Sequence, residues 1–332
     1  MTNFAFLLHL NIAILTPEYF FSGTLTVLTN VALLIFMTFR RKLRSSQHAI
    51  TISSLVTAFL FAAIYIFPRF SYAIKRFNDT QVQPDDVRCG LFSRIGLALF
   101  LSLSCHILLR TIQMYLMICH PFKSANWLLK RNTYMALVLV WSMTIAIPLG
   151  TQIYFEISYT YIGPQTSDFC RNSSIEFLRY CSIITAIFSI LVLFLLTITY
   201  GRILIITNRT RARIRTVSVT TSSTSDNRMP KLKRRSKAMN QVLTVYMLYF
   251  LFWIPFLIMV LYTQYNPDLQ REIWPDSTYV ALRTTQYIAF LFPAIQPILF
   301  AIFTSDIYTE IAKTCHFHRR SIASKKSTFN DC

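Results

Sequence analysis

The segment "RTIQMYLMICHPFK", residues Arg110–Lys123, ends a long apolar stretch that begins at Leu91. Leu91–Cys119 contains no Asp or Glu and is rich in Leu, Ile and Met. A helix that crosses a membrane needs about 20 mostly apolar residues for a hydrocarbon core about 30 Å thick. The stretch therefore predicts a membrane-spanning helix that ends at a basic loop.

The rest of the chain divides in the same way, and we expect an all-α membrane protein with a seven-helix bundle. Lipid offers no partner for free backbone groups, so each span must be a helix. The composition agrees, because 54% of residues are hydrophobic and 14% are charged, against about 25% charged in soluble domains. The predicted spans are Tyr19–Thr38, Ile50–Tyr72, Leu91–Cys119, Thr133–Tyr154, Phe177–Ile206, Val242–Tyr262 and Tyr279–Phe303.

The net charge of +19 is distributed unevenly over the loops. Basic residues concentrate in four segments, Arg40–Arg44, Lys123–Arg131, Arg202–Lys237 and the tail after Phe303. Loops with excess Lys and Arg face the cytoplasm, and such loops attract anionic membrane lipids. We therefore expect no nucleic-acid partner and a multi-pass plasma-membrane protein. Residues 1–18 should form an uncleaved extracellular N-terminus, 19–303 the membrane domain, and 304–332 a cytoplasmic surface helix and tail.

Cysteine and sugar-acceptor positions fit this topology. Cys89 and Cys170 fall on the predicted outer side, where an oxidising compartment allows a disulfide, with two unpaired thiols as the alternative. Asn78 and Asn172 begin outer N-x-S/T sequences that could carry glycans. Cys315 lies among basic residues after the last span and is either a palmitoylation site or a plain cysteine.

Several motifs follow one another in an order that resembles the rhodopsin-like family of G-protein-coupled receptors, from about Tyr19 to Cys315. "QMYLMICHPFK" stands where that family has D-R-Y followed by a similar ending. "FWIPF" is similar to C-W-x-P-F, and "QPILFAIF" is close to N-P-x-x-Y. The other matches are Asn30 in the first span, Leu55 and Pro68 in the second, Trp141 and Pro148 in the fourth, Tyr200 near the inner end of the fifth, and an amphipathic segment at about Ser305–Ala312.

The resemblance implies roles in activation for several residues. Pro255 and Pro297 each remove a helical hydrogen bond and allow a kink, and Trp253 lies two residues before Pro255. Trp253 would sense a ligand, or would be a packing residue only. Phe122 would contact the G protein, or would anchor the loop in the membrane surface.

Departures from the family pattern concern the same machinery. The helix-2 aspartate is replaced by Phe59, so we expect no sodium site. D-R-Y is replaced by Gln113-Met114-Tyr115, and N-P-x-x-Y by Gln296-Pro297 with Phe300 as its last residue. No proline occurs from Phe177 to Tyr200. These changes leave G-protein coupling open while the fold remains expected.

Arg110 lies four residues before Met114, one helical turn and about 6 Å deeper. A buried cation needs polar partners, and Gln113 and Gln296 are the candidates. We interpret Arg110 as taking over the role of the missing arginine. The alternative is that Arg110 extends to the membrane interface along its aliphatic stem.

The resemblance also places a ligand site, whose walls are aromatic or polar and uncharged. Gly96 stands where amine receptors have an aspartate, and Tyr279–Phe303 contains no lysine for retinal. A peptide ligand is therefore favoured, with a chemosensory ligand as the alternative, and neither cofactor nor metal is expected. Any wall residue could instead be plain core; the candidates are Gly96, Phe100, Trp253, Phe256, Leu257, Gln286 and Phe290.

The residues of the spans discriminate among four possible functions. The absence of Asp and Glu from all seven spans argues against an ion-coupled transporter or channel, and no enzyme motif is present. A receptor that signals through a heterotrimeric G protein is the favoured function. Phosphorylation of the hydroxyl-rich segment Thr216–Ser225 would weaken its attachment to anionic lipid or attract arrestin; the alternative is a solvated loop without modification. A receptor-fold decoy, scaffold or partner subunit without its own signalling is the alternative.

Overall fold

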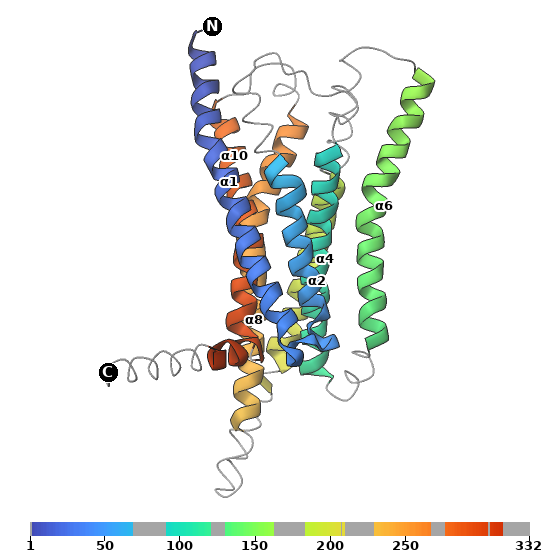
Figure 1. Ribbon diagram of the computed structural model, residues 1–332, viewed down its shortest axis with the longest axis vertical. Helices are drawn as coiled ribbons and strands as arrows, with labels where there is room; N and C mark the ends of the chain where they lie inside the picture. The colour runs from blue at the N-terminus through green and yellow to red at the C-terminus, as the bar shows by residue number, and fades with distance from the viewer. Residues whose placement is uncertain are drawn as a thin grey trace, which may run out of the picture.

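The computed structural model describes residues 2–68, 91–120, 130–162, 183–206, 208–209, 229–266, 276–304 and 306–314. Every regular element in these ranges is a helix. Figure 1 shows long helices running side by side, with the start of α1 at one end of the bundle and residues 306–314 across the other. We call these the N-terminal end and the C-terminal end of the bundle.

The helices correspond to the predicted spans in number and order. In chain order the structure has α1 (Thr2–Phe39), the 3₁₀ turn η1 (Arg41–Arg44), α2 (Ser46–Leu60) continued by the π-helix η2 (Phe61–Ile66), α4 (Leu91–Cys119), α6 (Lys130–Ile162), the helix Ile183–Ile206, α8 (Met229–Tyr265), α10 (Asp276–Phe303) and a short helix at residues 306–314. The all-α seven-helix fold class is thereby confirmed.

Length and hydropathy confirm six of the spans directly. Six of the described helices are long and apolar enough to cross a membrane, while α8 carries a shorter apolar segment, Met247–Thr263. The helix α4 has the predicted bounds Leu91–Cys119. The helix α1 runs back to Thr2, although its apolar span begins at Tyr19 as expected. The residues ahead of that span are therefore a helical extension.

The helix α4 lies at the centre of the bundle and α6 at its edge. In α4, 61% of the span is buried, compared with 22% in α6, and Figure 1 shows α6 on the outer side of the bundle. Val138 on α6 is 67% exposed and Leu139 is 59% exposed. A membrane helix places such side chains toward lipid tails, so the exposed apolar face of α6 agrees with a bilayer surrounding.

Polar side chains inside the bundle join neighbouring helices. Trp141 Nε1 of α6 donates a hydrogen bond of 2.9 Å to Ser53 Oγ of α2, which lies 2.8 Å from His106 Nε2 of α4. Asn30 Nδ2 of α1 donates to the Pro293 carbonyl of α10 over 2.9 Å. Buried polar groups are costly without partners, so these contacts favour one arrangement of the helices.

Candidate functional site

An aromatic cluster joins three elements toward the N-terminal end of the bundle. Phe290 of α10 packs against Phe61 and Tyr65 of η2 with ring centroids 5.6 and 5.8 Å apart. Tyr19 of α1 lies 6.1 Å from the same ring. Edge-on packing of this kind stabilises aromatic pairs beyond their buried area. Phe290 was a predicted wall residue, whereas Tyr19, Phe61 and Tyr65 were missed.

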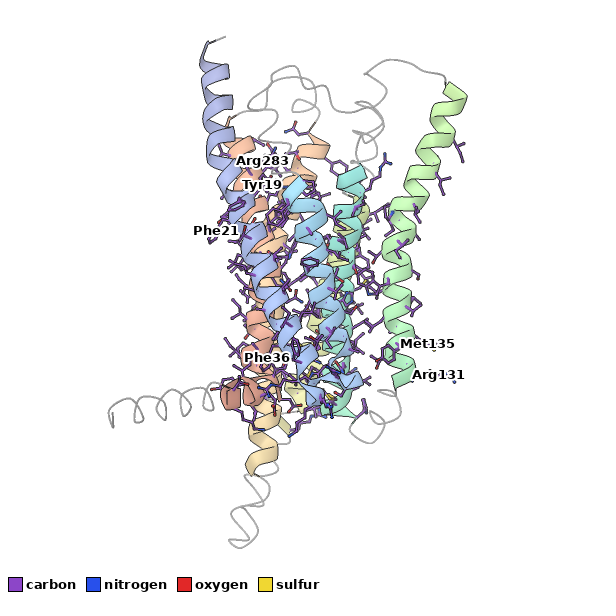
Figure 2. All side chains as sticks on the ribbon, in the orientation of Figure 1. Tyr19, Phe21, Phe36, Arg131, Met135 and Arg283 are labelled. Carbon is purple, nitrogen blue, oxygen red and sulfur yellow. The ribbon has the colours of Figure 1, made fainter. Side chains whose placement is uncertain are left out.

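A polar cluster lies beside these rings. Tyr19 Oη donates to Gln286 Oε1 over 3.1 Å. Arg283 Nη1 donates to both Tyr19 Oη and Gln286 Oε1 over 3.0 Å, and Figure 2 shows Tyr19 and Arg283 together at this end. Arg283 lies one turn before Gln286 on the same face of α10, so the spacing of three residues was the signal that could have found it. The wall that was expected to be uncharged therefore has a cation next to Gln286.

Gly96 of α4 is covered by a side chain of η2. A Cβ atom added at Gly96 would overlap the ring of Tyr65. The same tyrosine ring lies 5.2 Å from Phe61. The wall at this position is thus formed by the Tyr65 ring, and a glycine permits the ring to lie directly on the backbone of α4.

The remaining predicted wall residues lie between α4 and α8. The ring centroids of Phe100 and Trp253 are 4.2 Å apart, and those of Trp253 and Phe256 are 6.3 Å apart. Phe100, Trp253 and Phe290 belong to one apolar core cluster, and Leu257 is also buried on α8. The structure therefore brings the predicted residues into two neighbouring groups, one around Trp253 and one around Gln286.

A pair of buried hydroxyl groups joins α4 to α8, and Tyr249, which supplies one of them, lies one helical turn before Trp253. Ser104 Oγ of α4 is 3.0 Å from Tyr249 Oη of α8, and both residues are at most 1% exposed. Ser104 also donates to the Phe100 carbonyl over 3.1 Å. Because the serine has one proton, Tyr249 is the donor in the bond between the helices. No pattern in the sequence indicated this link between α4 and α8.

Arg110 is buried at the C-terminal end of the bundle. Its Nη1 donates to Gln113 Oε1 over 2.8 Å. Gln113 was one of the two predicted partners. The second candidate, Gln296, donates instead to Ser54 Oγ of α2 over 3.0 Å. Met114 is also buried.

The carboxylate that faces Arg110 comes from the short helix at residues 306–314. Asp306 interacts electrostatically with Arg110, and its Oδ2 lies 4.0 Å from His48 Nε2 of α2. His48 in turn interacts with Arg110. No local spacing indicated Asp306, since α2, α4 and the short helix meet only through the fold.

The other predicted positions divide into described and undescribed residues. Pro255 lies inside α8 and Pro297 inside α10, and Phe300 is buried. The ring centroids of Tyr115 and His120 are 5.7 Å apart. Tyr200 and Phe59 are half-buried. Cys89, Cys170, Asn78, Asn172, Phe122 and Cys315 lie outside the described residues.

Within the residues that the structure describes, no group of three or more His, Cys, Asp or Glu side chains is placed to hold a metal ion.

Comparison with known proteins agrees with this arrangement. The family described as "7 transmembrane receptor (rhodopsin family)" matches residues 29–300. The chain is also similar to the melatonin receptor type 1B-B of Danio rerio, with 22% identity over 315 residues that cover 91% of this chain and 81% of that receptor.

Proposed function

This chain belongs to the rhodopsin family of seven-transmembrane receptors, and on that premise we propose how it receives and passes on a signal. It is a multi-pass membrane receptor of the G-protein-coupled class. An extracellular ligand binds among the side chains around Trp253 and Gln286. A heterotrimeric G protein binds at the C-terminal end, which lies on the cytoplasmic side of the plasma membrane. Residues 1–18 are extracellular, and the surface helix and tail at 304–332 are cytoplasmic.

The observation that carries this proposal is the position of Arg110. Its guanidinium lies at the C-terminal end of the bundle, bonded to Gln113 and facing Asp306. A cation held there by Gln113 of α4 and by Asp306 of the helix at 306–314 can change partners when the helices move. Arg110 therefore supplies the charge that Met114 lacks, and coupling persists without the usual arginine.

The test combines two substitutions in cells. Arg110→Leu should lower second-messenger signalling by about tenfold at equal surface expression, since hydrogen bonds to charged groups contribute about 1.5–3 kcal/mol. Met114→Arg in the double variant should restore it, because the arginine then returns one turn along α4. If Arg110→Leu signals like the parent, Arg110 has no part in coupling.

The ligand proposal is a peptide that uses the cluster of Tyr19, Arg283 and Gln286. The cluster offers guanidinium donors and an amide, which suit the carbonyl and carboxylate groups that peptides carry. The aromatic rings beside it offer apolar contact area. Screening a peptide library on cells that express the receptor, with Arg283→Gln as the matched variant, tests this assignment. A response that Arg283→Gln leaves unchanged would contradict the assigned binding mode.

Two other outcomes of the screen are informative. The similar receptor in Danio rerio is named for melatonin, so melatonin belongs in the screen as a small aromatic probe. A response to melatonin without any peptide response would replace the peptide assignment.

The substitution of Met114 for the family's arginine favours a second function, a receptor-fold decoy or scaffold. Binding without any second-messenger change would support the decoy.

A further inference from the structure

The turn η1 presents three cations because one of its residues is buried. Leu43 is 0% exposed and packs with Met37 and Ile307 in a small apolar cluster at the C-terminal end. The 3₁₀ geometry, closed by a bond of 2.9 Å from Leu43 N to the Arg40 carbonyl, then leaves Arg41, Lys42 and Arg44 exposed. Burial of Leu43 therefore sets the direction of these side chains.

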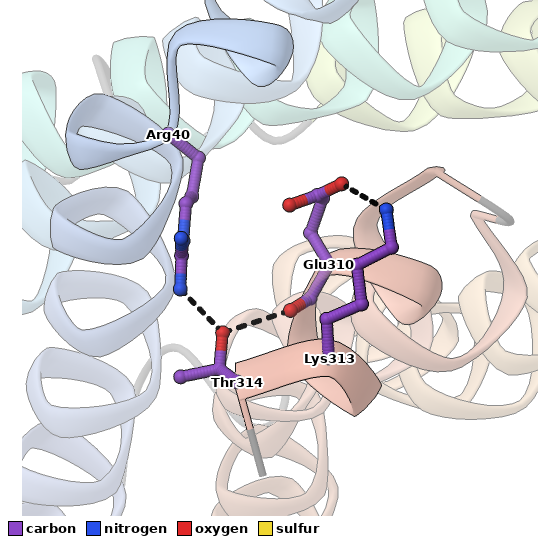
Figure 3. A network of polar contacts seen from close by, with 4 residues as sticks. All are labelled: Arg40, Glu310, Lys313 and Thr314. Carbon is purple, nitrogen blue, oxygen red and sulfur yellow. Dashed lines mark hydrogen bonds and ion pairs between the residues drawn. The ribbon is translucent and has the colours of Figure 1, made fainter. Parts of the chain in front are cut away.

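The short helix at residues 306–314 is bound to the same turn. Arg40 Nη2 donates to Thr314 Oγ1 over 2.6 Å, and Thr314 Oγ1 donates to the Glu310 carbonyl over 2.8 Å (Figure 3). Lys313 Nζ donates to Glu310 Oε1 over 3.0 Å. This bond lowers the pKa of Glu310, and the nearby charges of Lys42 and Arg40 act in the same direction. The turn and the helix thus share one electrostatic surface.

This surface is strongly positive. Residues 40–45 and 306–314 together contain five basic side chains and two acidic ones. One acid, Glu310, is already paired with Lys313, and the other, Asp306, faces His48 and Arg110. The cations of η1 therefore remain the dominant charges of the exposed surface.

The surface also lies at the depth of lipid headgroups. The turn follows directly after the membrane span Tyr19–Phe39, and the short helix follows shortly after the span Val280–Phe303. Phe39 is 78% exposed and Tyr308 is 52% exposed, and aromatic side chains favour the membrane interface. The cations are thus held beside the bilayer, where a lipid can reach them without leaving the leaflet.

We infer that η1 and the helix at 306–314 form a binding site for the polyphosphorylated headgroup of a phosphoinositide lipid. Arginine forks match phosphate oxygens in pairs, and several cations on one short turn suit a headgroup with several phosphates better than a single anionic charge. Clusters of Lys and Arg next to a membrane helix are known to bind such lipids. The inference rests on the proposed cytoplasmic orientation, but on neither the ligand nor the coupling role of Arg110.

The experiment uses the full chain in nanodiscs of neutral phosphatidylcholine. A fluorescent phosphatidylinositol bisphosphate is added, and its binding is measured by energy transfer from a label on the receptor. The triple variant Arg41→Gln, Lys42→Gln and Arg44→Gln should weaken binding by at least about tenfold, because each lost cation weakens attraction to anionic lipid severalfold. Phosphatidylserine at the same total charge should compete poorly.

The matched control removes the same charge elsewhere. Arg131, Arg202 and Arg209 are exposed, and Figure 2 places Arg131 at the same end of the bundle, so their triple change to Gln should leave binding nearly unchanged. Equal losses in both triple variants would show diffuse charge attraction and overturn the site. Equal competition by phosphatidylserine, or displacement by the soluble inositol phosphate headgroup at a concentration equal to that of the lipid, would overturn the lipid assignment. Thermal unfolding of each variant verifies that it is folded.

Discussion

Gly96 and Tyr65 illustrate how a single residue sets the shape of the ligand region. The ring of Tyr65 lies against the backbone of α4 because Gly96 has no Cβ atom. The π-helix η2 that carries Tyr65 also carries Phe61, and π-helical turns are frequent at functional sites. A side chain larger than hydrogen at residue 96 would push the ring into the space proposed for the ligand.

Gly96→Ala should therefore lower the free energy of unfolding by about 1–3 kcal/mol, the usual cost of overpacking. Adding Tyr65→Ala should recover part of this loss, since the overlapping ring is gone. Gly150 on α6 has nothing within 4 Å of an added Cβ, so Gly150→Ala should be neutral or slightly stabilising. Thermal unfolding of the purified receptor measures all three. Equal losses for Gly96→Ala and Gly150→Ala would exclude the steric explanation.

Tyr249 makes a second prediction at this scale. Tyr249→Phe removes the hydrogen bond to Ser104 that joins α8 to α4. It should lower the free energy of unfolding by about 0.5–1.5 kcal/mol. Ser104 retains its bond to the Phe100 carbonyl, so its own hydroxyl donor is not orphaned. Basal signalling should rise, because α8 is released from the central helix. Tyr262→Phe on the same helix, at a residue that is 51% exposed, is the control and should change neither quantity.

At the scale of elements, the short helix at residues 306–314 is coupled to the bundle by burial and by charge. Ile307 is 0% exposed in the apolar cluster with Leu43, while Asp306 faces His48 and Arg110. The position of this helix therefore depends on the positions of both α2 and α4. A movement of α4 that carries Arg110 away would remove the charge that faces Asp306.

Arg110→Gln and Asp306→Asn should consequently be non-additive. A double-mutant cycle on the free energy of unfolding should give a coupling of about 0.5–3 kcal/mol, the range for residues in contact. Glu310 lies on the same short helix but pairs with Lys313, so the cycle of Arg110→Gln with Glu310→Gln should be additive. A coupling near zero in the first cycle would mean that Asp306 is not the carboxylate that balances Arg110.

At the scale of the whole molecule, the distribution of charge determines orientation. The basic turn η1 and the helix at residues 306–314 both lie at the C-terminal end, as the excess of Lys and Arg in the predicted cytoplasmic loops requires. The opposite end carries the proposed ligand site. In the proposed orientation, that opposite end would meet the ligand and the C-terminal end would meet the G protein.

Glycan mapping tests this orientation. Asn78 and Asn172 should carry sugars, whereas Asn208, which also begins an N-x-S/T sequence, should carry none. Glycosidase treatment should increase the gel mobility of the parent receptor, and replacement of both Asn78 and Asn172 by Gln should abolish that shift. A mobility shift that disappears only with Asn208→Gln would show that the topology is inverted, and it would contradict the receptor assignment.

The sequence by itself determined the number, order and approximate bounds of the spans. Apolar length decides insertion, because a lipid core excludes unpaired backbone groups whatever the neighbouring helices are. Leu91–Cys119 was predicted with its observed bounds. Phe100, Trp253 and Phe290 were predicted as walls of a ligand site or as plain core, and the structure places them in one apolar core cluster. The bond between Arg110 and Gln113 was also within reach, because residues three apart share a face of a helix.

The tertiary structure alone decided which side chains face one another across the bundle. The ring of Tyr65 on Gly96, the cluster of Tyr19 with Arg283 and the approach of Asp306 to Arg110 join residues far apart in the chain. The apolar pattern could not reveal them, since lipid-facing and core-facing positions of a membrane helix are both apolar and periodicity is weak. Rotation and packing of the helices, set by small residues and polar contacts between them, placed these groups together.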